Sequence, residues 1–272
     1  MAPIAQDQIE RQPSRIDRIL ASVPPAFWTL AVLLFLWEFS VHAAEVPAFI
    51  LPAPSAIIEE IINYGHRLLP NALVTLGEVL FGFLCAVAVG VPLAVMIVYS
   101  RFMEKAVYPL IVASQTIPKV AIAPLMLTWF GYGIAPKIVI VVLLSFFPIV
   151  INSVMGLKST TREMIYLSRS MGASGWQTFW KFRLPQALPS IFAGLKLATA
   201  LSVIGAIVAE FIGADKGLGY LILIAGANFN IARQFASVVL ISLIGVLFFV
   251  ALEQIERVAV PWRARSTTNG ED

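Results

Sequence analysis

Long apolar runs constrain the fold of this chain more than any other feature of its sequence. A helix needs about 20 mainly apolar residues to cross a hydrocarbon core that is roughly 30 Å thick. Six runs approach or exceed this length: residues 26–42, 71–99, 106–130, 134–157, 188–212 and 234–255. Hydrophobic residues make up 59% of the chain and charged residues 13%, whereas soluble domains have about 45–50% and about 25%. The sequence therefore predicts an all-α, polytopic membrane protein with six transmembrane helices.

The runs divide the chain into an N-terminal tail (residues 1–25), a transmembrane domain (26–257) and a C-terminal tail (258–272). Ala43 and Ala44 follow the first run, as small residues follow a signal peptide. However, about 25 residues precede this run, and it is longer than a usual signal core. We interpret it as an uncleaved anchor.

The distribution of basic residues predicts the orientation, because short loops rich in Lys and Arg stay on the cytoplasmic side. With the N-terminus inside, thirteen of the 19 Lys and Arg residues fall in inner segments. The outer segments hold four, which are Arg67, Lys137, Lys216 and Arg233, and two more lie within the runs. Both tails are therefore expected in the cytoplasm of a bacterial cell, with the chain in its inner membrane.

Several function classes are excluded by what the sequence lacks. A net charge of +3 is too small and dispersed to indicate nucleic-acid binding. The single cysteine, Cys85, and the two histidines, His42 and His66, cannot complete a metal site. The chain has no Gly-Lys dipeptide, so the phosphate-binding loop of an ATPase is absent. We therefore expect a non-enzymatic chain that binds no cofactor and hydrolyses no ATP itself.

The inner connection between the fourth and fifth runs, residues 158–186, is polar enough to stay in water and patterned enough to fold; we call it the inner loop. Thr160 and Glu163 form a predicted capping box, with a helix beginning near Thr161. Gly172 is the residue most able to adopt the left-handed conformation that ends such a helix.

A second capping box restarts the helix at Ser174 and Gln177. Pro185 lacks an amide and disfavours helical geometry at the residue before it, so this second helix is expected to stop near Arg183. The inner loop should then consist of two short helices at an angle.

Aromatic and basic residues alternate along the second of these helices. They are Trp176, Phe179, Trp180 and Phe182, with Lys181 and Arg183. Such residues are enriched at membrane interfaces, but aromatics also dominate binding hot spots. The helix could rest on the membrane surface or fit a cleft on another protein, and different faces could do each.

Lys119 lies within the third run, between Pro118 and Pro124. An ionisable group at membrane depth is costly enough to suggest a transport pathway, and the two prolines predict a bent or interrupted helix there. The alternative is a lysine that extends along its four-carbon stem to the membrane surface.

Carboxylates mark the outer halves of the second and fifth runs. Glu210 could pair with a lysine on another span and form a gate, or it could be hydrated at the outer mouth. Lys196 is a further candidate for the pathway or gate. Placing the Glu78 carboxylate at membrane depth would also be costly, unless Glu78 lies near the outer face. Small residues, among them Gly77 and Gly194, should let helices approach closely.

With Tyr166-Leu167-Ser168, Gly172 and Phe182-Arg183-Leu184-Pro185, the inner loop resembles the EAA loop of ABC importer permeases. In that family Glu-Ala-Ala is followed after three residues by Gly, and after nine more by Ile-x-Leu-Pro. Here the same spacing is occupied by Tyr166-Leu167-Ser168, Gly172 and Phe182-Arg183-Leu184-Pro185. The spacing matches throughout, although the triplet letters differ and Phe182 replaces the Ile.

The resemblance extends over nearly all of residues 50–260 and points to the permeases of the nitrate, sulfonate, taurine and thiamine-precursor group. The segments that carry it are 51–55 (LPAPS), 117–125 (IPKVAIAPL), 129–131 (WFG), 147–149 (FPI), 209–210 (AE) and 217–219 (GLG). Four others look most like permeases for hydroxymethylpyrimidine, a thiamine precursor: 114–119 (SQTIPK), 129–133 (WFGYG), 146–148 (FFP) and 202–206 (SVIGA).

The resemblance implies a type I importer with two permease subunits, two ATPase subunits that carry ATP and Mg on the cytoplasmic side, and an extracytoplasmic binding protein that delivers the solute. Two copies of this chain are expected to line one pathway. The residues that would contact the ATPase are Tyr166, Leu167, Ser168, Gly172, Ala173, Ser174, Phe182, Leu184 and Pro185. The expected solute is a thiamine precursor or a nitrate-, sulfonate- or taurine-like anion, and riboflavin stays open.

Two other classes of membrane protein make different predictions for the sequence. A transporter driven by an ion gradient should have repeated halves with broken helices at matching positions, and residues 26–130 and 134–257 show no convincing repeat. A membrane-embedded enzyme would need clustered catalytic polar residues, whereas the polar residues here are isolated along the sequence.

Overall fold

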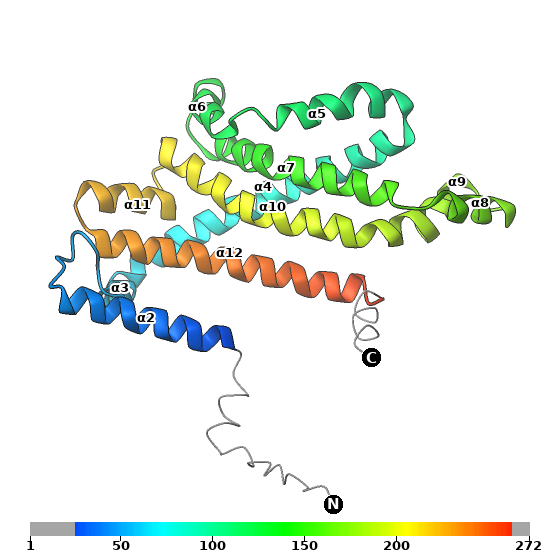
Figure 1. The fold of residues 1–272 in the computed structure, drawn as a ribbon. Helices are drawn as coiled ribbons and strands as arrows, with labels where there is room; N and C mark the ends of the chain where they lie inside the picture. The colour runs from blue at the N-terminus through cyan, green and yellow to red at the C-terminus, as the bar shows by residue number, and fades with distance from the viewer. Residues whose placement is uncertain (1–24, 263–272) are drawn as a thin grey trace, which may run out of the picture.

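The computed structural model describes residues 25–262, so the expected N-terminal tail and most of the C-terminal tail lie outside the described part. Figure 1 shows a bundle of long helices with shorter ones at both ends. The elements are α2 (Pro25–Ala43), α3 (Pro54–Asn63), α4 (Gly65–Tyr99), η1 (Met103–Val107), α5 (Tyr108–Ser114), η2 (Lys119–Ile122), α6 (Ala123–Phe130), α7 (Ile134–Lys158), α8 (Arg162–Ser170), α9 (Gly175–Thr178), η3 (Phe179–Arg183), α10 (Leu184–Gly213), α11 (Leu218–Ala227) and α12 (Ile231–Ala259).

The predicted all-α membrane architecture is confirmed in the described residues, with five or six spans. Five helices are long and apolar enough to cross a membrane, and a bent pair makes a sixth if its two halves count as one span. The pair consists of residues 103–114 and 119–130, which meet at 85°. The break falls just before Lys119, where Pro118 interrupts the chain, as its missing amide predicts.

Helix α7 is the centre of the bundle and packs most extensively against α10 and α4. Small residues permit these contacts: a Cβ at Gly194 of α10 would lie 2.8 Å from the carbonyl oxygen of Pro148 in α7. Close backbone approach of this kind is a main source of helix association in lipid. The α7–α10 pair therefore forms the rigid framework on which the remaining helices are placed.

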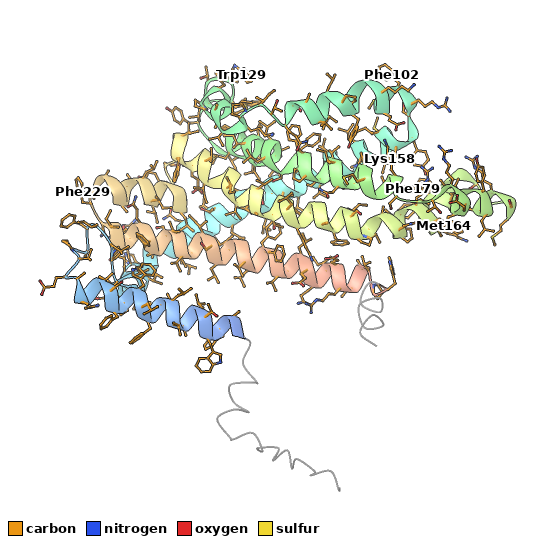
Figure 2. All side chains as sticks on the ribbon, viewed as in Figure 1. Phe102, Trp129, Lys158, Met164, Phe179 and Phe229 are labelled. Carbon is orange, nitrogen blue, oxygen red and sulfur yellow. The ribbon has the colours of Figure 1, made fainter. Side chains whose placement is uncertain are left out.

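Helix α2 lies at the edge of the bundle, beside α3, and exposes most of its apolar side chains. A helix that is apolar on all sides is suited to lipid. Figure 2 shows side chains projecting outward around the whole bundle. The exposed apolar surface is thus what a membrane would cover.

The inner loop occupies one end of the bundle, where α8 and α9 project beyond α7 and α10 (Figure 1). Trp129 and Phe229 mark the opposite end in Figure 2, near α6 and α11. We call this the outer end, in line with the expected orientation. Helix α11 was not predicted, because its ten residues are too few to span a membrane.

Candidate functional site

The first helix of the inner loop ends as its sequence predicts. Gly172 has a left-handed φ of +77°, its amide donates to the carbonyl of Arg169 at 2.9 Å, and the amide of Ala173 donates to the carbonyl of Ser168 at 3.0 Å. This pair of bonds is a Schellman motif. The helix start differs slightly from the prediction, because Thr161, not Thr160, is the cap and accepts from the Met164 amide at 3.5 Å.

The second capping box is confirmed. The Ser174 hydroxyl accepts from the Gln177 amide at 3.3 Å, and the Gln177 side chain accepts from the Ser174 amide at 2.9 Å. The helix stop expected near Arg183 is wrong, since Gly175–Gly213 forms one continuous helical segment. The π-helical turn η3 directly before α10 shifts the hydrogen bonds by one residue, so the missing amide of Pro185 is accommodated without a break.

The two helices of the inner loop are tied together by Ser168, the third residue of the EAA-like triplet. Its side chain is fully buried, and its hydroxyl lies 3.2 Å from that of Thr178. The first two residues of the triplet, Tyr166 and Leu167, are exposed. In the triplet that matches the EAA spacing, the third residue is therefore buried and the first two are exposed.

An exposed apolar and aromatic surface covers this part of the inner loop. Trp176 is 69% exposed and Met171 74%, and Trp180 and Leu167 are also exposed. Beside them lies a groove of about 330 Å³. It is lined by Ser168, Met171, Gly172, Ala173, Gln177, Lys181 and Phe182. Exposed aromatic side chains on an otherwise polar loop are typical of a membrane interface or of a binding surface for another protein.

Three contacts that nothing in the sequence indicates join the inner loop to other spans. At its exit, the Tyr99 ring of α4 packs edge-on against Phe179 at 5.9 Å, and Arg183 lies 5.2 Å from the same ring. At its entry, Lys158 donates to Glu104 of η1 at 2.6 Å. These contacts would therefore transmit movement of the inner loop to the second and third spans as well as to α7 and α10.

Glu210 lies in a buried hydrogen-bonded cluster at the outer end, so the hydrated alternative is wrong. Its carboxylate accepts from the Thr75 hydroxyl at 2.6 Å and from the Gly219 amide at 2.5 Å. The Thr75 oxygen in turn accepts from the Leu218 amide at 2.9 Å. The predicted AE and GLG segments thus meet in space, where α10, α4 and the start of α11 join. Within the described residues, no lysine forms a direct ion pair with Glu210.

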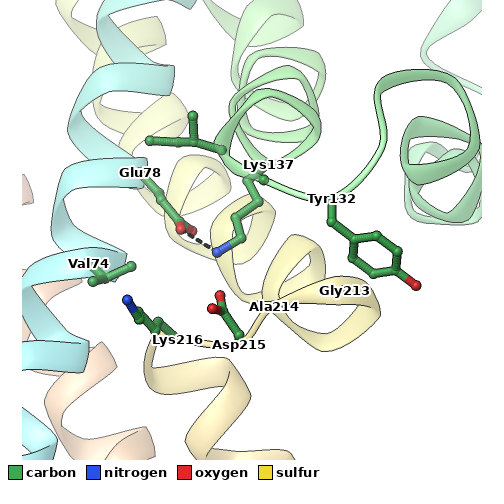
Figure 3. A pocket seen from close by; sticks show the side chains of 10 residues that line it. Val74, Glu78, Tyr132, Lys137, Gly213, Ala214, Asp215 and Lys216 are labelled. Carbon is green, nitrogen blue, oxygen red and sulfur yellow. Dashed lines mark hydrogen bonds and ion pairs between the residues drawn. The ribbon is translucent and has the colours of Figure 1, made fainter.

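Glu78 and Lys137 form a buried ion pair next to this cluster. The Lys137 Nζ lies 2.7 Å from Glu78 Oε1, and Lys137 is only 7% exposed. Figure 3 shows the two side chains reaching toward each other from α4 and α7. Glu78 thus lies near the outer end, as one alternative held, but it is buried there and paired with Lys137, which the sequence placed in an outer segment.

The other two pathway candidates lie apart from Glu210. Lys119 lies at the break between α5 and α6, where its Nζ donates to the Gln115 carbonyl at 3.2 Å and sits 4.4 Å from the centre of the Phe147 ring. Lys196 pairs with Glu256 of α12 at 2.5 Å. The structure does not bring the three candidates together.

The described residues contain no group of three or more His, Cys, Asp or Glu side chains that could hold a metal ion.

Comparisons with known proteins agree with this architecture. Residues 79–263 match the family described as "Binding-protein-dependent transport system inner membrane component". The chain is 39% identical to the formylaminopyrimidine transport permease protein ThiX of Halalkalibacterium halodurans, over 92% of this chain and 100% of ThiX. It is 36% identical to the riboflavin transport system permease protein RibX of Chloroflexus aurantiacus, over 87% and 89% of the two chains. The taurine transport system permease protein TauC of Escherichia coli is 29% identical over 86% and 88%.

Proposed function

Because this chain belongs to the family of inner-membrane components of binding-protein-dependent transport systems, we propose that two copies of it form the solute pathway of an ATP-driven type I importer. As a transport permease, the chain is not itself an enzyme. A separate pair of ATPase subunits, carrying ATP and Mg, supplies the energy, and an extracytoplasmic binding protein delivers the solute.

The observation that carries this proposal is the construction of the inner loop. Both of its helices are capped and are hydrogen-bonded to each other through Ser168 and Thr178, and yet the loop exposes Trp176 and Met171. An ordered apolar surface on an otherwise polar loop is suited to a cleft on a partner protein. The contacts of Tyr99 and Lys158 give that partner a mechanical connection to four spans.

The proposed orientation places the inner loop and both tails in the cytoplasm. It rests on the excess of Lys and Arg in the inner segments. The inner loop would then face the compartment where ATP is available, and the outer end would face the binding protein.

Homodimerisation is proposed because symmetric pairs are the commonest closed assembly and a single bundle has few polar residues to line a path. Lys119 is the proposed pathway residue, since it lies at a helix break and is half-buried. Glu210 and Lys196, in contrast, are engaged by neighbouring helices. We propose that these two shape the pathway by holding helices in place.

A thiamine precursor of the hydroxymethylpyrimidine type is the proposed solute. The support is the similarity to ThiX, whose name specifies formylaminopyrimidine transport. Nitrate, sulfonates and taurine are the second candidates, supported by the more distant similarity to TauC.

The test is Gly172→Val, with Gly175→Val as its matched control. Both glycines lie in the inner loop with no heavy atom within 4 Å of an added Cβ. Only Gly172 has a left-handed φ, which a β-branched residue adopts at a cost of about 1–3 kcal/mol. We expect Gly172→Val to reduce copurification of the ATPase and solute uptake, and Gly175→Val to reduce neither. Unaltered copurification and uptake in Gly172→Val would overturn the proposal.

A transporter driven by an ion gradient is the alternative. Uptake that continues when the partner ATPase is catalytically inactive, and that collapses with an ionophore, would favour it.

A further inference from the structure

Two hollows lie side by side where the inner loop faces the end of α4. The first has a volume of about 130 Å³, and its lining includes Arg169 and Arg183. The second has a volume of about 210 Å³, and its lining includes Trp176. Tyr99 and Gly175 line both hollows, which therefore adjoin each other. We call the first hollow the arginine pocket and the second the aromatic crevice.

The arginine pocket concentrates positive charge without a countercharge. No carboxylate lines it, and within residues 25–262 neither Arg169 nor Arg183 forms an ion pair. The Arg183 guanidinium lies 5.2 Å from the centre of the Tyr99 ring. Two like charges in one pocket repel each other unless an anion lies between them, and the guanidinium fork matches the geometry of a phosphate. The arginine pocket is therefore complementary to a phosphate group.

The aromatic crevice has a membrane span as one of its walls. Val95 and Tyr99 lie in the last turns of α4, whose apolar run ends there. Trp176 and Phe179 of the inner loop form the opposite wall, and Figure 2 shows Phe179 at this end of the bundle. Arg101, directly beyond α4, is the first basic residue after the span. Aromatic side chains at such a boundary are typical of the membrane interface, so the crevice lies where acyl chains meet headgroups.

The groove beside Met171 is formed by a different set of residues. Gln177 and Lys181 line that groove and neither of the two hollows, whereas Trp176 and Arg183 line the hollows and not the groove. The exposed apolar surface of the inner loop therefore divides into two sides. The groove side stays available to the partner ATPase, and the side toward α4 needs a different occupant.

We propose that the arginine pocket and the aromatic crevice together bind one anionic phospholipid of the cytoplasmic leaflet. The lipid phosphate would lie between Arg169 and Arg183, and the beginning of an acyl chain would lie in the crevice along Tyr99 and Trp176. Basic pockets on the cytoplasmic side of membrane proteins bind lipid headgroups in this way. The inference rests on the proposed function for the cytoplasmic orientation of the inner loop.

A bound phosphate would also connect the two helices of the inner loop. Arg169 belongs to α8, and Arg183 belongs to η3 at the other end of the loop. An anion shared by the two side chains would add a link to the hydrogen bond between Ser168 and Thr178. The lipid would thus hold the inner loop against the end of α4.

A zwitterionic lipid is disfavoured by the same arrangement. The choline group of phosphatidylcholine would bring a positive charge next to two arginines that have no carboxylate beside them. Phosphatidylglycerol carries the same phosphate without that cation, so the two arginines attract its whole headgroup. The preference between these two lipids is the property that the test measures.

The test measures lipid binding to the purified full-length chain in an uncharged detergent by native mass spectrometry. Phosphatidylglycerol and phosphatidylcholine with identical acyl chains are titrated separately. The variant is Arg169→Gln/Arg183→Gln. Its matched control is Arg162→Gln/Lys181→Gln, which removes the same charge from the inner loop but lies outside both hollows.

We expect the unaltered chain to bind phosphatidylglycerol more tightly than phosphatidylcholine. Arg169→Gln/Arg183→Gln should weaken phosphatidylglycerol binding about thirtyfold, and Arg169→Gln alone about fivefold, from the contribution of each arginine to attraction by anionic lipid. The control should change it less than about twofold. Arg169 is exposed, so the result for its single variant does not depend on the folding of a core substitution.

Equal affinities for the two lipids, or equal losses in the variant and the control, would overturn the inference. Displacement of phosphatidylglycerol by millimolar glycerol phosphate would overturn it as well, because the crevice would then contribute nothing. Loss of ATPase copurification in Arg169→Gln with unchanged lipid binding would instead show a protein contact. The binding assay needs no ATPase, solute or uptake, so it can fail while the Gly172→Val test still supports the proposed function.

Discussion

The Glu210 cluster gives a prediction whose size can be worked out from the structure. Thr75→Val keeps the shape of a buried side chain but removes the hydroxyl that donates to Glu210 and accepts from the Leu218 amide. The variant leaves the carboxylate with one donor fewer and the amide at the start of α11 with no partner. Both consequences follow from the loss of one oxygen atom.

The expected destabilisation is several kcal/mol. A hydrogen bond between helices in a membrane is worth only about 0.6–2 kcal/mol, but a bond to a charged group contributes about 1.5–3 kcal/mol, and an orphaned buried amide costs about 1–3 kcal/mol. Together these give about 3–5 kcal/mol for Thr75→Val. At roughly 2–4 °C per kcal/mol for a chain of this size, the Tm should fall by about 6–20 °C.

Thr199→Val is the matched control. Thr199 is as buried as Thr75, but its hydroxyl donates only to the Lys196 carbonyl of its own helix, at 2.7 Å. Losing such a local bond should cost about 1 kcal/mol. The assay is thermal unfolding of the purified protein in detergent. Equal Tm values for the two variants would refute the view that the cluster joins three helices.

Two further predictions concern close packing and the pathway. Gly194→Ala should cost about 1–3 kcal/mol through overpacking against α7, whereas Gly77→Ala, which meets no atom within 4 Å, should be neutral or stabilising by up to about 1 kcal/mol; equal unfolding temperatures would contradict this. Lys119→Met should lower the initial uptake rate about tenfold, as expected for one lost charged hydrogen bond, while the exposed control Lys105→Met should not. Uptake at the wild-type rate by a normally expressed Lys119→Met would favour a lysine that only reaches toward the membrane surface.

The presence of five or six long apolar helices could be predicted from the sequence because hydrophobic length is a local property. The same holds for two signals of the inner loop, the helix end at Gly172 and the capping box at Ser174, whereas the first cap lies one residue later than predicted. Gly172 and the Ser174 box act within a few residues, so their free energies do not depend on the rest of the fold. The break near Lys119 was predicted for the same reason, since a proline affects its own helical turn.

Other features depended on residues far apart in the chain. Thr75 and Glu210 are separated by 135 positions, and nothing local indicates that they meet. The sequence predicts Lys137 as a basic residue of an outer segment, but the packing of α4 against α7 buries it beside Glu78. An isolated charge in a sequence does not reveal its partner.

The helix that continues past Pro185 shows the limit of local rules most directly. Local chemistry alone predicts an end near Arg183, yet a π-helical turn absorbs the proline and carries the inner loop into α10. Sequence determined the spans, their breaks and the caps, because these arise from neighbouring residues in a single segment. Tertiary structure decided the partners of the buried charges and the anchoring of the inner loop, because those free energies arise only when separate helices pack together.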